Sequence, residues 1–233
     1  FEAVKTNIIG SQNLITACQN LKIKKVIALS TDKAAAPINL YGATKLTADK
    51  LFVASNNYSG SSPFAASVVR YGNVMSSRGS VIPHFKKNRD KKFLEITDLK
   101  MTRFNITLDQ GVNFVLDSLK RMVGGEIFVP KIPSYRITDL AKAIAPQAKF
   151  KVVGKRPGEK INEEMITTSD AINSIDCKSY YVILPSLGYL SKNHINKIIK
   201  INKGKFCEEN FSYNSGNNEH FLSISELKKL IQK

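Results

Sequence analysis

Apolar and amphipathic segments alternate along the first 70 residues of the chain. Residues 4–20 repeat apolar side chains at helical spacing, which predicts a helix. Four of these side chains are expected to face the core: Leu14, Ala17, Cys18 and Leu21. Residues 24–30 are apolar on both sides, as in a central parallel strand. A helix over about 41–58 and a strand over 64–70 follow, so we expect an α/β fold with a doubly wound parallel sheet.

The pattern predicts shorter elements in the rest of the chain. Helices are expected over 81–88, about 112–119, 138–145 and 223–233, and strands over 93–97, 126–129, 149–153 and 180–184. The strand over 180–184 is followed by Pro185 and is expected at the edge of a sheet. Residues 186–220 are rich in lysine and asparagine and have no clear period, which favours a loop or partial disorder.

Composition and charge narrow the class of protein. Hydrophobic residues make up 42% of the 233 residues and charged residues 23%, which is typical of soluble globular proteins. No window approaches 18 uncharged apolar residues, so we expect no membrane span and no membrane partner. The net charge of +16 also fits nucleic-acid binding. The lysine groups lack interleaved aromatic residues, however, so an anionic ligand is favoured over nucleic acid.

The positions of the cysteines and histidines argue against a disulfide framework and against a metal site. Cys18, Cys177 and Cys207 are far apart and odd in number, which disfavours a disulfide framework or a zinc site and suits a reducing cytoplasm. His84 and His220 have no metal-ligand spacing. We therefore expect a cytoplasmic protein without a metal site.

The strongest candidate for chemistry is the stretch 30–45, which joins the first strand to the second helix. Tyr41 and Lys45 are four residues apart, so the phenol and the ammonium lie on one helix face. Asp32 and Lys33 come directly after the strand, at the end where open α/β sheets bind ligands. Tyrosine is a poor base at neutral pH, but a nearby lysine cation favours the phenolate. We interpret the stretch as an active site; the alternative is a core-edge tyrosine beside solvated charges.

Three ordered motifs extend this interpretation. They read Ser-Thr-Asp-Lys-Ala-x-x-Pro-x-Asn-Leu-Tyr-Gly-x-Thr-Lys at 30–45, Arg-Tyr-Gly-Asn-Val at 70–74 and Ser-Arg-Gly-Ser-Val-Ile-Pro at 77–83. From residue 1 to about 185 the chain resembles the extended short-chain dehydrogenase/reductase family, and within it the inverting sugar-nucleotide 4,6-dehydratases. Retaining dehydratases and some epimerases commonly carry Met where this sequence has Tyr41. The inverting branch is therefore favoured, and the other two stay open.

The resemblance implies an activity and a role for each residue. UDP-N-acetylglucosamine is the implied substrate and NADP the implied cofactor, with NAD as the alternative. Tyr41, activated by Lys45, would take the C4 hydroxyl proton as hydride passes to the cofactor. Lys33 would then remove the C5 proton, Asp32 would help the C6 hydroxyl leave as water, and Thr31 would hydrogen-bond near O4. The product, a 4-keto-6-deoxy sugar nucleotide inverted at C5, would open pseudaminic acid synthesis for flagellin or surface glycans.

The resemblance also implies two sets of binding residues. Cofactor contacts are expected from Ser30, Tyr41, Lys45, Val74, Met75, Ser76, Ser77 and Arg78. Substrate contacts are expected from Thr31, Asn73, Arg103, Arg156 and Glu159. Asn7 is expected to order Lys45 through water. For Arg156 and Glu159 the alternative is an exposed turn.

Domain boundaries follow from the same resemblance. Residues 1–75 would be the C-terminal half of an NAD(P)-binding Rossmann domain, 76–185 a substrate-binding region with some Rossmann elements, and 186–233 an irregular lysine-rich tail. No glycine-rich dinucleotide fingerprint follows a strand, so we expect an N-terminally truncated chain that binds NADPH poorly on its own. A homo-oligomer is also expected. The alternative of another class is a non-catalytic remnant or binding module.

Overall fold

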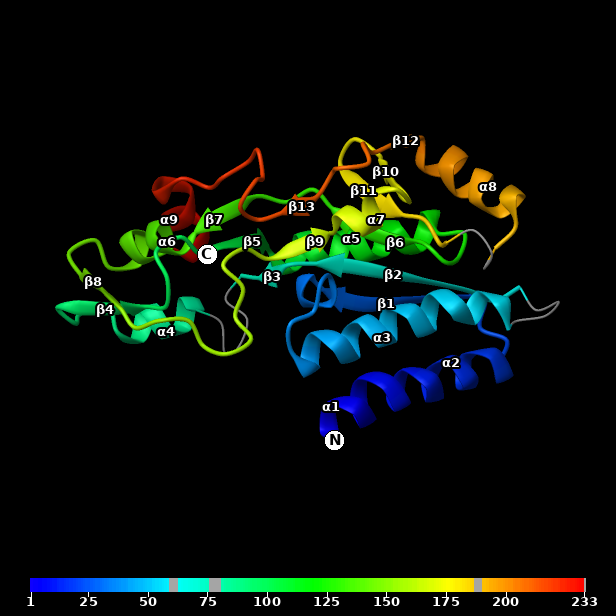
Figure 1. Ribbon diagram of the computed structural model, residues 1–233, viewed down its shortest axis with the longest axis horizontal. Coiled ribbons are helices and arrows are strands. Elements are labelled where there is room, and N and C mark those ends of the chain that lie inside the picture. Colours follow the sequence, from blue (N-terminus) through cyan, green and yellow to red (C-terminus); the bar gives the residue numbers. More distant parts are fainter. Residues whose placement is uncertain (59–62, 76–80, 187–189, 233) are drawn as a thin grey trace. The chain divides into compact units, whose positions relative to one another are not determined.

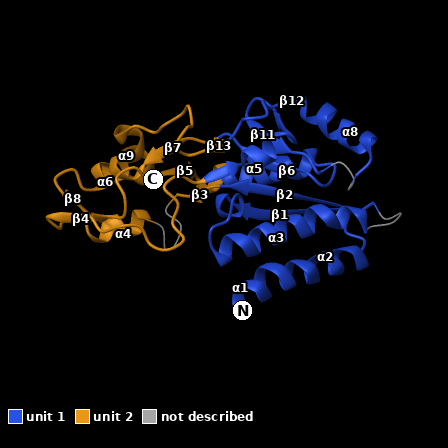
Figure 2. Ribbon diagram, viewed as in Figure 1, with its two compact units in different colours: residues 1–71, 111–131, 164–212 blue, residues 72–110, 132–163, 213–233 orange. Residues whose placement is uncertain are grey.

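The chain forms two units, each assembled from separated stretches of sequence. The computed structural model describes residues 1–58, 63–75, 81–186 and 190–232. Unit 1 comprises Phe1–Tyr71, Gly111–Lys131 and Glu164–Ser212, and unit 2 comprises Gly72–Gln110, Ile132–Glu163 and Tyr213–Lys233 (Figure 2). These limits differ from the expected divisions after residues 75 and 185, because the chain passes from one unit to the other several times.

Unit 1 is built on a six-stranded sheet. The strand order is β1-β2-β6-β11-β10-β12. The strands are β1 Lys25–Thr31, β2 Ala65–Tyr71, β6 Ile127–Pro130, β10 Ser174–Asp176, β11 Tyr180–Ile183 and β12 Lys205–Phe206. β1, β2 and β6 are parallel, whereas the pairs from β6 onward are antiparallel. The predicted α/β class is confirmed, and the parallel arrangement holds for three of these six strands.

Helices lie against this sheet in layers. The further elements of unit 1 are α1 Glu2–Val4, η1 Lys5–Ile9, α2 Gly10–Asn20, η2 Asp32–Ala34, α3 Leu40–Ala54, η3 Ser55–Asn57, α5 Leu108–Arg121 (whose first residues belong to unit 2), β9 Glu164–Ile166, α7 Thr168–Ala171 and α8 Lys192–Asn202. α3 packs against β1 and β2, and α2 packs against α3. Figure 1 shows α3 and α2 as successive layers beside these strands.

Two strands lie elsewhere in the sheet than expected. β1, predicted to be central, is the first strand of the order, and the side chain of Leu29 is 50% exposed there. β11, predicted at an edge, lies between β6 and β10 with all four residues buried. Antiparallel pairing on both sides of β11 explains the error, because Pro185 lies beyond the last paired residue and interrupts no hydrogen bond.

The first helix is present, but its inner face differs from the prediction. Helical residues run from Glu2 to Asn20, with a π-helical turn at η1. Leu14 and Leu21 are 51% and 75% exposed, whereas Ile15 is buried. The segment carries two apolar stripes, and packing against α3 buries the one that contains Ile15.

The lysine-rich segment that follows residue 186 contains a helix. It contains α8, which begins at the Ser191 cap and ends at Lys203 in the left-handed conformation. Ile195 and Ile198 of α8 are buried in the core of unit 1, together with Val69, Phe128 and Val182 of the sheet. The expectation of a loop or partial disorder over 186–220 is therefore wrong for Lys192–Asn202, whereas the helix expected over 223–233 is present as α9 Ile224–Gln232. The helical spacing of isoleucines in α8 is diluted by lysine and asparagine on the exposed face, which hides the period.

Unit 2 has two smaller sheets and its own core. Its elements are β3 Asn73–Val74, α4 Val81–Lys87, β4 Phe93–Ile96, β5 Thr102–Ile106, β7 Ser134–Arg136, α6 Ile137–Ile144, β8 Lys149–Val152, β13 Tyr213–Asn214 and α9 Ile224–Gln232. β3-β5-β7 form one sheet and β4-β8 another. α6 and α9 pack together over a core that includes Leu94, Leu140 and Leu227. Among the described residues, no helix has the length and apolar character needed to cross a bilayer.

Candidate active site

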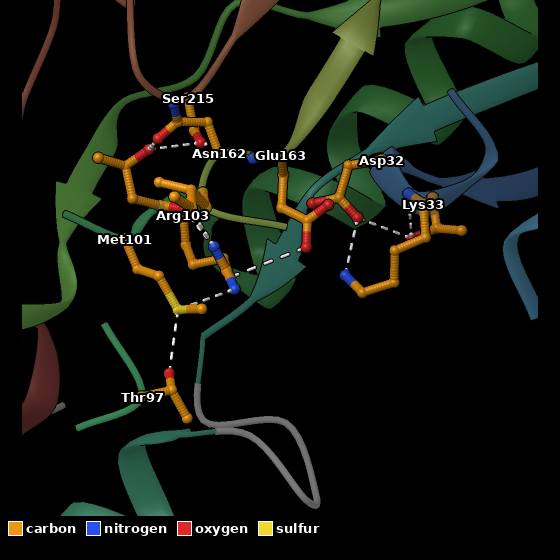
Figure 3. A network of polar contacts seen from close by, with 11 residues as sticks. Asp32, Lys33, Thr97, Met101, Arg103, Asn162, Glu163 and Ser215 are labelled. Atoms are coloured by element: carbon orange, nitrogen blue, oxygen red, sulfur yellow. Dashed lines mark hydrogen bonds and ion pairs between the residues drawn. The ribbon is translucent and has the colours of Figure 1, made fainter. Parts of the chain in front are cut away.

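The end of β1 carries a compact arrangement of polar side chains. Thr31 closes the strand, and its hydroxyl donates to Asp32 Oδ1 at 2.9 Å while it accepts from the backbone N–H of Lys33 at 3.4 Å. The ammonium of Lys33 donates to the same Asp32 oxygen at 3.0 Å (Figure 3). Asp32 is fully buried, whereas the side chain of Lys33 is 34% exposed. The pair thus has one member in the interior and one that reaches the surface.

One oxygen of Asp32 has no hydrogen-bond partner among the described residues. This oxygen, Oδ2, is buried, while Oδ1 accepts from both Thr31 and Lys33. An unsatisfied buried polar group costs roughly 1–3 kcal/mol, and its retention in a folded protein calls for an explanation. A carboxyl group held in this way is suited to exchange a proton with a bound molecule.

Helix α3 approaches the same turn through a glycine. The helix begins after Asn39, whose Oδ1 accepts from the Gly42 N–H at 2.8 Å. A Cβ at Gly42 would overlap the carbonyl oxygen of Lys33 and lie 3.0 Å from Cβ of Pro37. Only a residue without a side chain lets the helix lie this close to η2.

Tyr41 and Lys45 lie one turn apart on α3. The ammonium of Lys45 donates to the carbonyl oxygen of Leu29 at 2.7 Å, close to the end of β1. Tyr41 is 48% exposed. The structure therefore brings Lys45 close to the end of β1, and the predicted catalytic roles of Tyr41 and Lys45 stay predictions.

The π-helical turn η1 carries Asn7. Its amide donates to Thr44 Oγ1 at 3.0 Å, and Thr44 Oγ1 donates to the Tyr41 carbonyl oxygen at 2.9 Å. Asn7 is thereby tied to the residue before Lys45. π-Helical turns are frequent at functional sites. The predicted water-mediated link from Asn7 to Lys45 stays a prediction.

A buried network beneath the site was not predicted. Asp49 Oδ2 accepts from Ser30 Oγ at 2.8 Å and from Arg70 Nη2 at 3.2 Å. Burial raises the pKa of the Asp49 carboxyl, although the Arg70 cation and the Ser30 hydrogen bond oppose the shift. The one available signal was Asp49 at helical spacing from Tyr41 and Lys45. The inward position of the Ser30 hydroxyl also leaves its predicted cofactor contact untested.

Several predicted binding residues belong to unit 2. Asn73 and Val74 form β3, and Met75 packs against the core of unit 2. Arg103 Nη1 donates to the carbonyl oxygens of Thr102 at 2.7 Å and Ile161 at 3.0 Å, and its Nε lies 3.8 Å from Glu163 Oε1 (Figure 3). These bonds hold Arg103 within unit 2. Their predicted ligand contacts stay predictions.

The remaining predicted positions lie either in a turn of unit 2 or outside the described residues. Arg156 and Glu159 close a turn, in which the Glu159 N–H donates to the Arg156 carbonyl and the Arg156 N–H donates to Glu159 Oε2, both at 3.1 Å. Ser76, Ser77 and Arg78 lie outside the described residues. Within the described ranges, no three histidine, cysteine, aspartate or glutamate residues are grouped so that they could hold a metal ion.

Several proteins are similar to this chain over nearly its whole length. The chain is 51% identical over 233 residues to the inverting UDP-N-acetylglucosamine 4,6-dehydratase of Campylobacter jejuni, covering 99% of this chain and 70% of that protein. It is 37% identical over 235 residues to a UDP-glucose 4-epimerase of Rickettsia akari, covering 99% and 67%. The X-ray structure of Pen from Bacillus thuringiensis matches with a TM-score of 0.84 and 36% identity, covering 100% of this chain and 69% of that one.

More distant structures share the fold. RMD from Pseudomonas aeruginosa complexed with NADPH matches 67% of this chain and 62% of its own, with a TM-score of 0.51 and 19% identity. UDP-glucose 4-epimerase from Brucella ovis in complex with NAD matches 67% and 60%, with a TM-score of 0.52 and 18% identity. Residues 1–185 match the family described as "Polysaccharide biosynthesis protein". This chain therefore belongs to that family and is a homologue of the inverting UDP-N-acetylglucosamine 4,6-dehydratases.

Proposed function

We propose that the protein converts UDP-N-acetylglucosamine into a UDP-2-acetamido-2,6-dideoxy-4-keto-hexose with inversion at C5. The observation that carries the proposal is the buried Asp32 paired with Lys33 at the end of β1, on the strand end that Lys45 contacts. Tyr41 and Lys45 alone suit an oxidation or an epimerisation. An acid and a base beside them add the elimination of water. The 51% identity to a dehydratase of this name supports the same substrate.

The residues present fit a nicotinamide cofactor on one side of the site. The Tyr41 side chain is 48% exposed, and the Lys45 ammonium lies against the Leu29 carbonyl at the strand end. When bound, NADP would accept a hydride from the sugar and later return it. Tyr41 and Lys45 are proposed to contact it, and the preference for NADP over NAD is part of the proposal.

Tyr41 is proposed to take the proton of the C4 hydroxyl. Lys45 lies one turn further along α3, on the same helix face as Tyr41. The 4-keto group that results makes the C5 hydrogen acidic, because the carbanion left at C5 is delocalised onto the ketone oxygen. The chain thereby prepares the sugar for elimination.

Asp32 and Lys33 are proposed to eliminate water together. Neutral Lys33 takes the C5 proton, protonated Asp32 gives its proton to the departing C6 hydroxyl, and the C6–O bond breaks to release water. The two residues end as the ion pair that the structure contains, with 3.0 Å between Lys33 Nζ and Asp32 Oδ1. Transfer of one proton across this contact restores the starting state. To complete the turnover, C6 would gain hydride from the reduced cofactor, C5 would take a proton from water on the opposite face, and Tyr41 would release the C4-hydroxyl proton to water, which restores its phenolate.

Other parts of the proposal rest on the resemblance. Asn73, Arg103, Arg156 and Glu159 are proposed to contact the substrate. The product is proposed to enter pseudaminic acid and surface-glycan synthesis in the cytoplasm, and the enzyme to act as a homo-oligomer. The three cysteines are free thiols, which fits a reducing compartment.

Mass spectrometry and NMR test the reaction. Because the chain is expected to bind NADPH poorly on its own, the assay needs NADP at a concentration that saturates the protein. Under that condition the chain should convert UDP-N-acetylglucosamine into a product about one water (~18 Da) lighter, and the same reaction in D2O should place deuterium at C5. The coupling between H5 and its ring neighbours in the product separates inversion from retention. Conversion to a sugar nucleotide of unchanged mass would instead favour the epimerase activity named for the Rickettsia akari relative. Binding without turnover would favour a non-catalytic module.

A Lys33→Ala variant separates oxidation from elimination. It should still oxidise C4, because Tyr41 and Lys45 remain, but form less than about 1% of the dehydrated product, since loss of a general base costs roughly 10²–10⁴-fold. Lys50→Ala, which removes an exposed lysine of α3, is the matched control and should retain activity. Normal dehydration by Lys33→Ala would refute the role assigned to Lys33.

A further inference from the structure

Helix α3 holds two consecutive residues of β1 through two side chains one turn apart. Lys45 donates to the Leu29 carbonyl at 2.7 Å, and Asp49 accepts from the Ser30 hydroxyl at 2.8 Å. Leu29 and Ser30 immediately precede Thr31, with which the acid–base turn begins. The side chains of one helix face thus bind the strand end that presents the proposed acid and base.

Arg70 links Asp49 to the next strand of the sheet, β2. Ser30 and Arg70 are paired positions of β1 and β2, and Asp49 Oδ2 bonds to both side chains. Arg70 Nη1 also donates to the Met165 carbonyl of β9 at 3.0 Å and lies 3.6 Å from Asp170 Oδ2 of α7. One guanidinium therefore joins β2, β9 and α7 to the Asp49 carboxylate.

The position of this ion pair is costly. Asp49 and Arg70 each expose 2% of their side chains, and Ser30 is 6% exposed. A buried ion pair is often no more stabilising than well-packed apolar side chains of similar volume. Stability alone is therefore a weak reason for placing two charges at this point.

We propose that Asp49 and Arg70 are positioning residues, which hold Ser30 and thereby set Thr31, Asp32 and Lys33 against the face of α3 that carries Tyr41 and Lys45. This inference deepens the proposed dehydratase function and rests on it. The two charged residues stay beneath the reacting groups and touch neither substrate nor cofactor. Displacement of Asp32 and Lys33 by a fraction of an ångström would misalign them with the C5 hydrogen and the C6 hydroxyl.

Two serine variants give a matched test. Ser30→Ala removes the hydroxyl bonded to Asp49, and Ser67→Ala removes an equally buried hydroxyl of β2 that donates to Glu126 Oε2 at 2.7 Å. Both should lower the urea midpoint of unfolding slightly and to a similar extent. Only Ser30→Ala should lower kcat, by roughly 10-fold, with KM for UDP-N-acetylglucosamine within about 3-fold of normal. Equal kcat values for the two variants would overturn the proposal.

A double variant separates positioning from stability. Asp49→Asn leaves the buried Arg70 cation with only the longer ion pair to Asp170 and should lower the urea midpoint and kcat together. Adding Arg70→Met removes that cation, so the midpoint should recover while kcat stays low. Recovery of kcat together with the midpoint would show that the ion pair contributes only to folding.

Amide hydrogen exchange keeps the test independent of the reaction. Ser30→Ala should speed exchange across residues 30–35 several-fold, and Ser67→Ala should leave that segment unchanged. If the unaltered protein forms no dehydrated product, the proposed function fails, and exchange alone still decides whether Asp49 orders the turn. Unchanged exchange in Ser30→Ala would overturn the positioning role in either case.

Discussion

Gly42→Ala tests how closely the catalytic turn and helix α3 must fit. The added methyl would overlap the Lys33 carbonyl oxygen and lie 3.0 Å from Pro37 Cβ and 3.3 Å from the Lys33 carbonyl carbon. Two of these three neighbours are backbone atoms, which cannot rotate away as the end of a flexible side chain can. The helix and η2 must therefore separate, and the proposed base Lys33 moves with its own carbonyl group.

The expected free-energy change combines two opposing effects. Replacing glycine by alanine in a helix stabilises by up to about 1 kcal/mol, while overpacking costs about 1–3 kcal/mol. The net loss is about 0–2 kcal/mol, so the variant should fold. A shift of about 1 Å in catalytic geometry can lower the rate about 100-fold. Gly42→Ala should therefore lose activity far beyond its loss of stability.

Gly10→Ala is the matched control for this variant. Gly10 is also helical, but its added methyl would have only an ordinary contact, 3.5 Å from the Lys5 carbonyl oxygen. Urea unfolding followed by circular dichroism should show Gly10→Ala equal to or more stable than the unaltered protein, with full dehydratase activity. The argument fails if Gly42→Ala is stabilised as much as Gly10→Ala and remains fully active.

Two further predictions concern groups away from the site. The buried Glu126 carboxylate accepts hydrogen bonds from Ser67 Oγ and from the N–H groups of Val123 and Gly124. Glu126→Gln should leave one of these buried donors unpaired and lower the free energy of unfolding by about 1–3 kcal/mol. Urea unfolding checks this against Glu2→Gln at an exposed position, and equal midpoints would contradict it. Burial, with a smaller contribution from the Asp176 charge, raises the pKa of the Cys207 thiol to about 11. About 0.1% of the Cys207 side chains are therefore in the thiolate form at pH 8, compared with roughly a quarter for an ordinary cysteine. Alkylation of Cys207 by iodoacetamide should rise about tenfold per pH unit between pH 8 and 10; peptide mass spectrometry checks this, and labelling at pH 8 as fast as in urea would contradict it.

The sequence predicts those parts of the fold that local spacing determines. β1 and β2 lie within one residue of their expected bounds, and α3 begins one residue before its expected start, because each has a strong apolar period and short links. The expected end of that helix near residue 58 includes the short helix η3 that follows α3. Lys45 reaches the Leu29 carbonyl near the end of β1 because the motif spans both the strand and the helix that covers it.

The rest depends on contacts that have no local signal. Asp49 and Arg70 are 21 positions apart, and nothing in the spacing of either residue predicts that they share a buried hydrogen bond. The exposure of Leu14 and the burial of Ile15 depend on which side of the helix meets α3. The antiparallel placement of β10 and β12 follows from pairing with β11, whereas their own sequences are too short to show a period.

The π-helical turn at η1 couples the length of the first helix to the site. Each residue of an α-helix advances the chain by about 100° around the helix axis. A π-helical turn contains one residue more than an α-helical turn, so deleting one residue of η1 would restore an ordinary helix and leave the residues on either side close to their present faces. Deleting one residue between Gly10 and Ile15 would instead rotate everything before it by about 100° and turn Asn7 away from Thr44. We infer that single-residue deletions among related sequences should fall in η1 and avoid the stretch between Gly10 and Ile15.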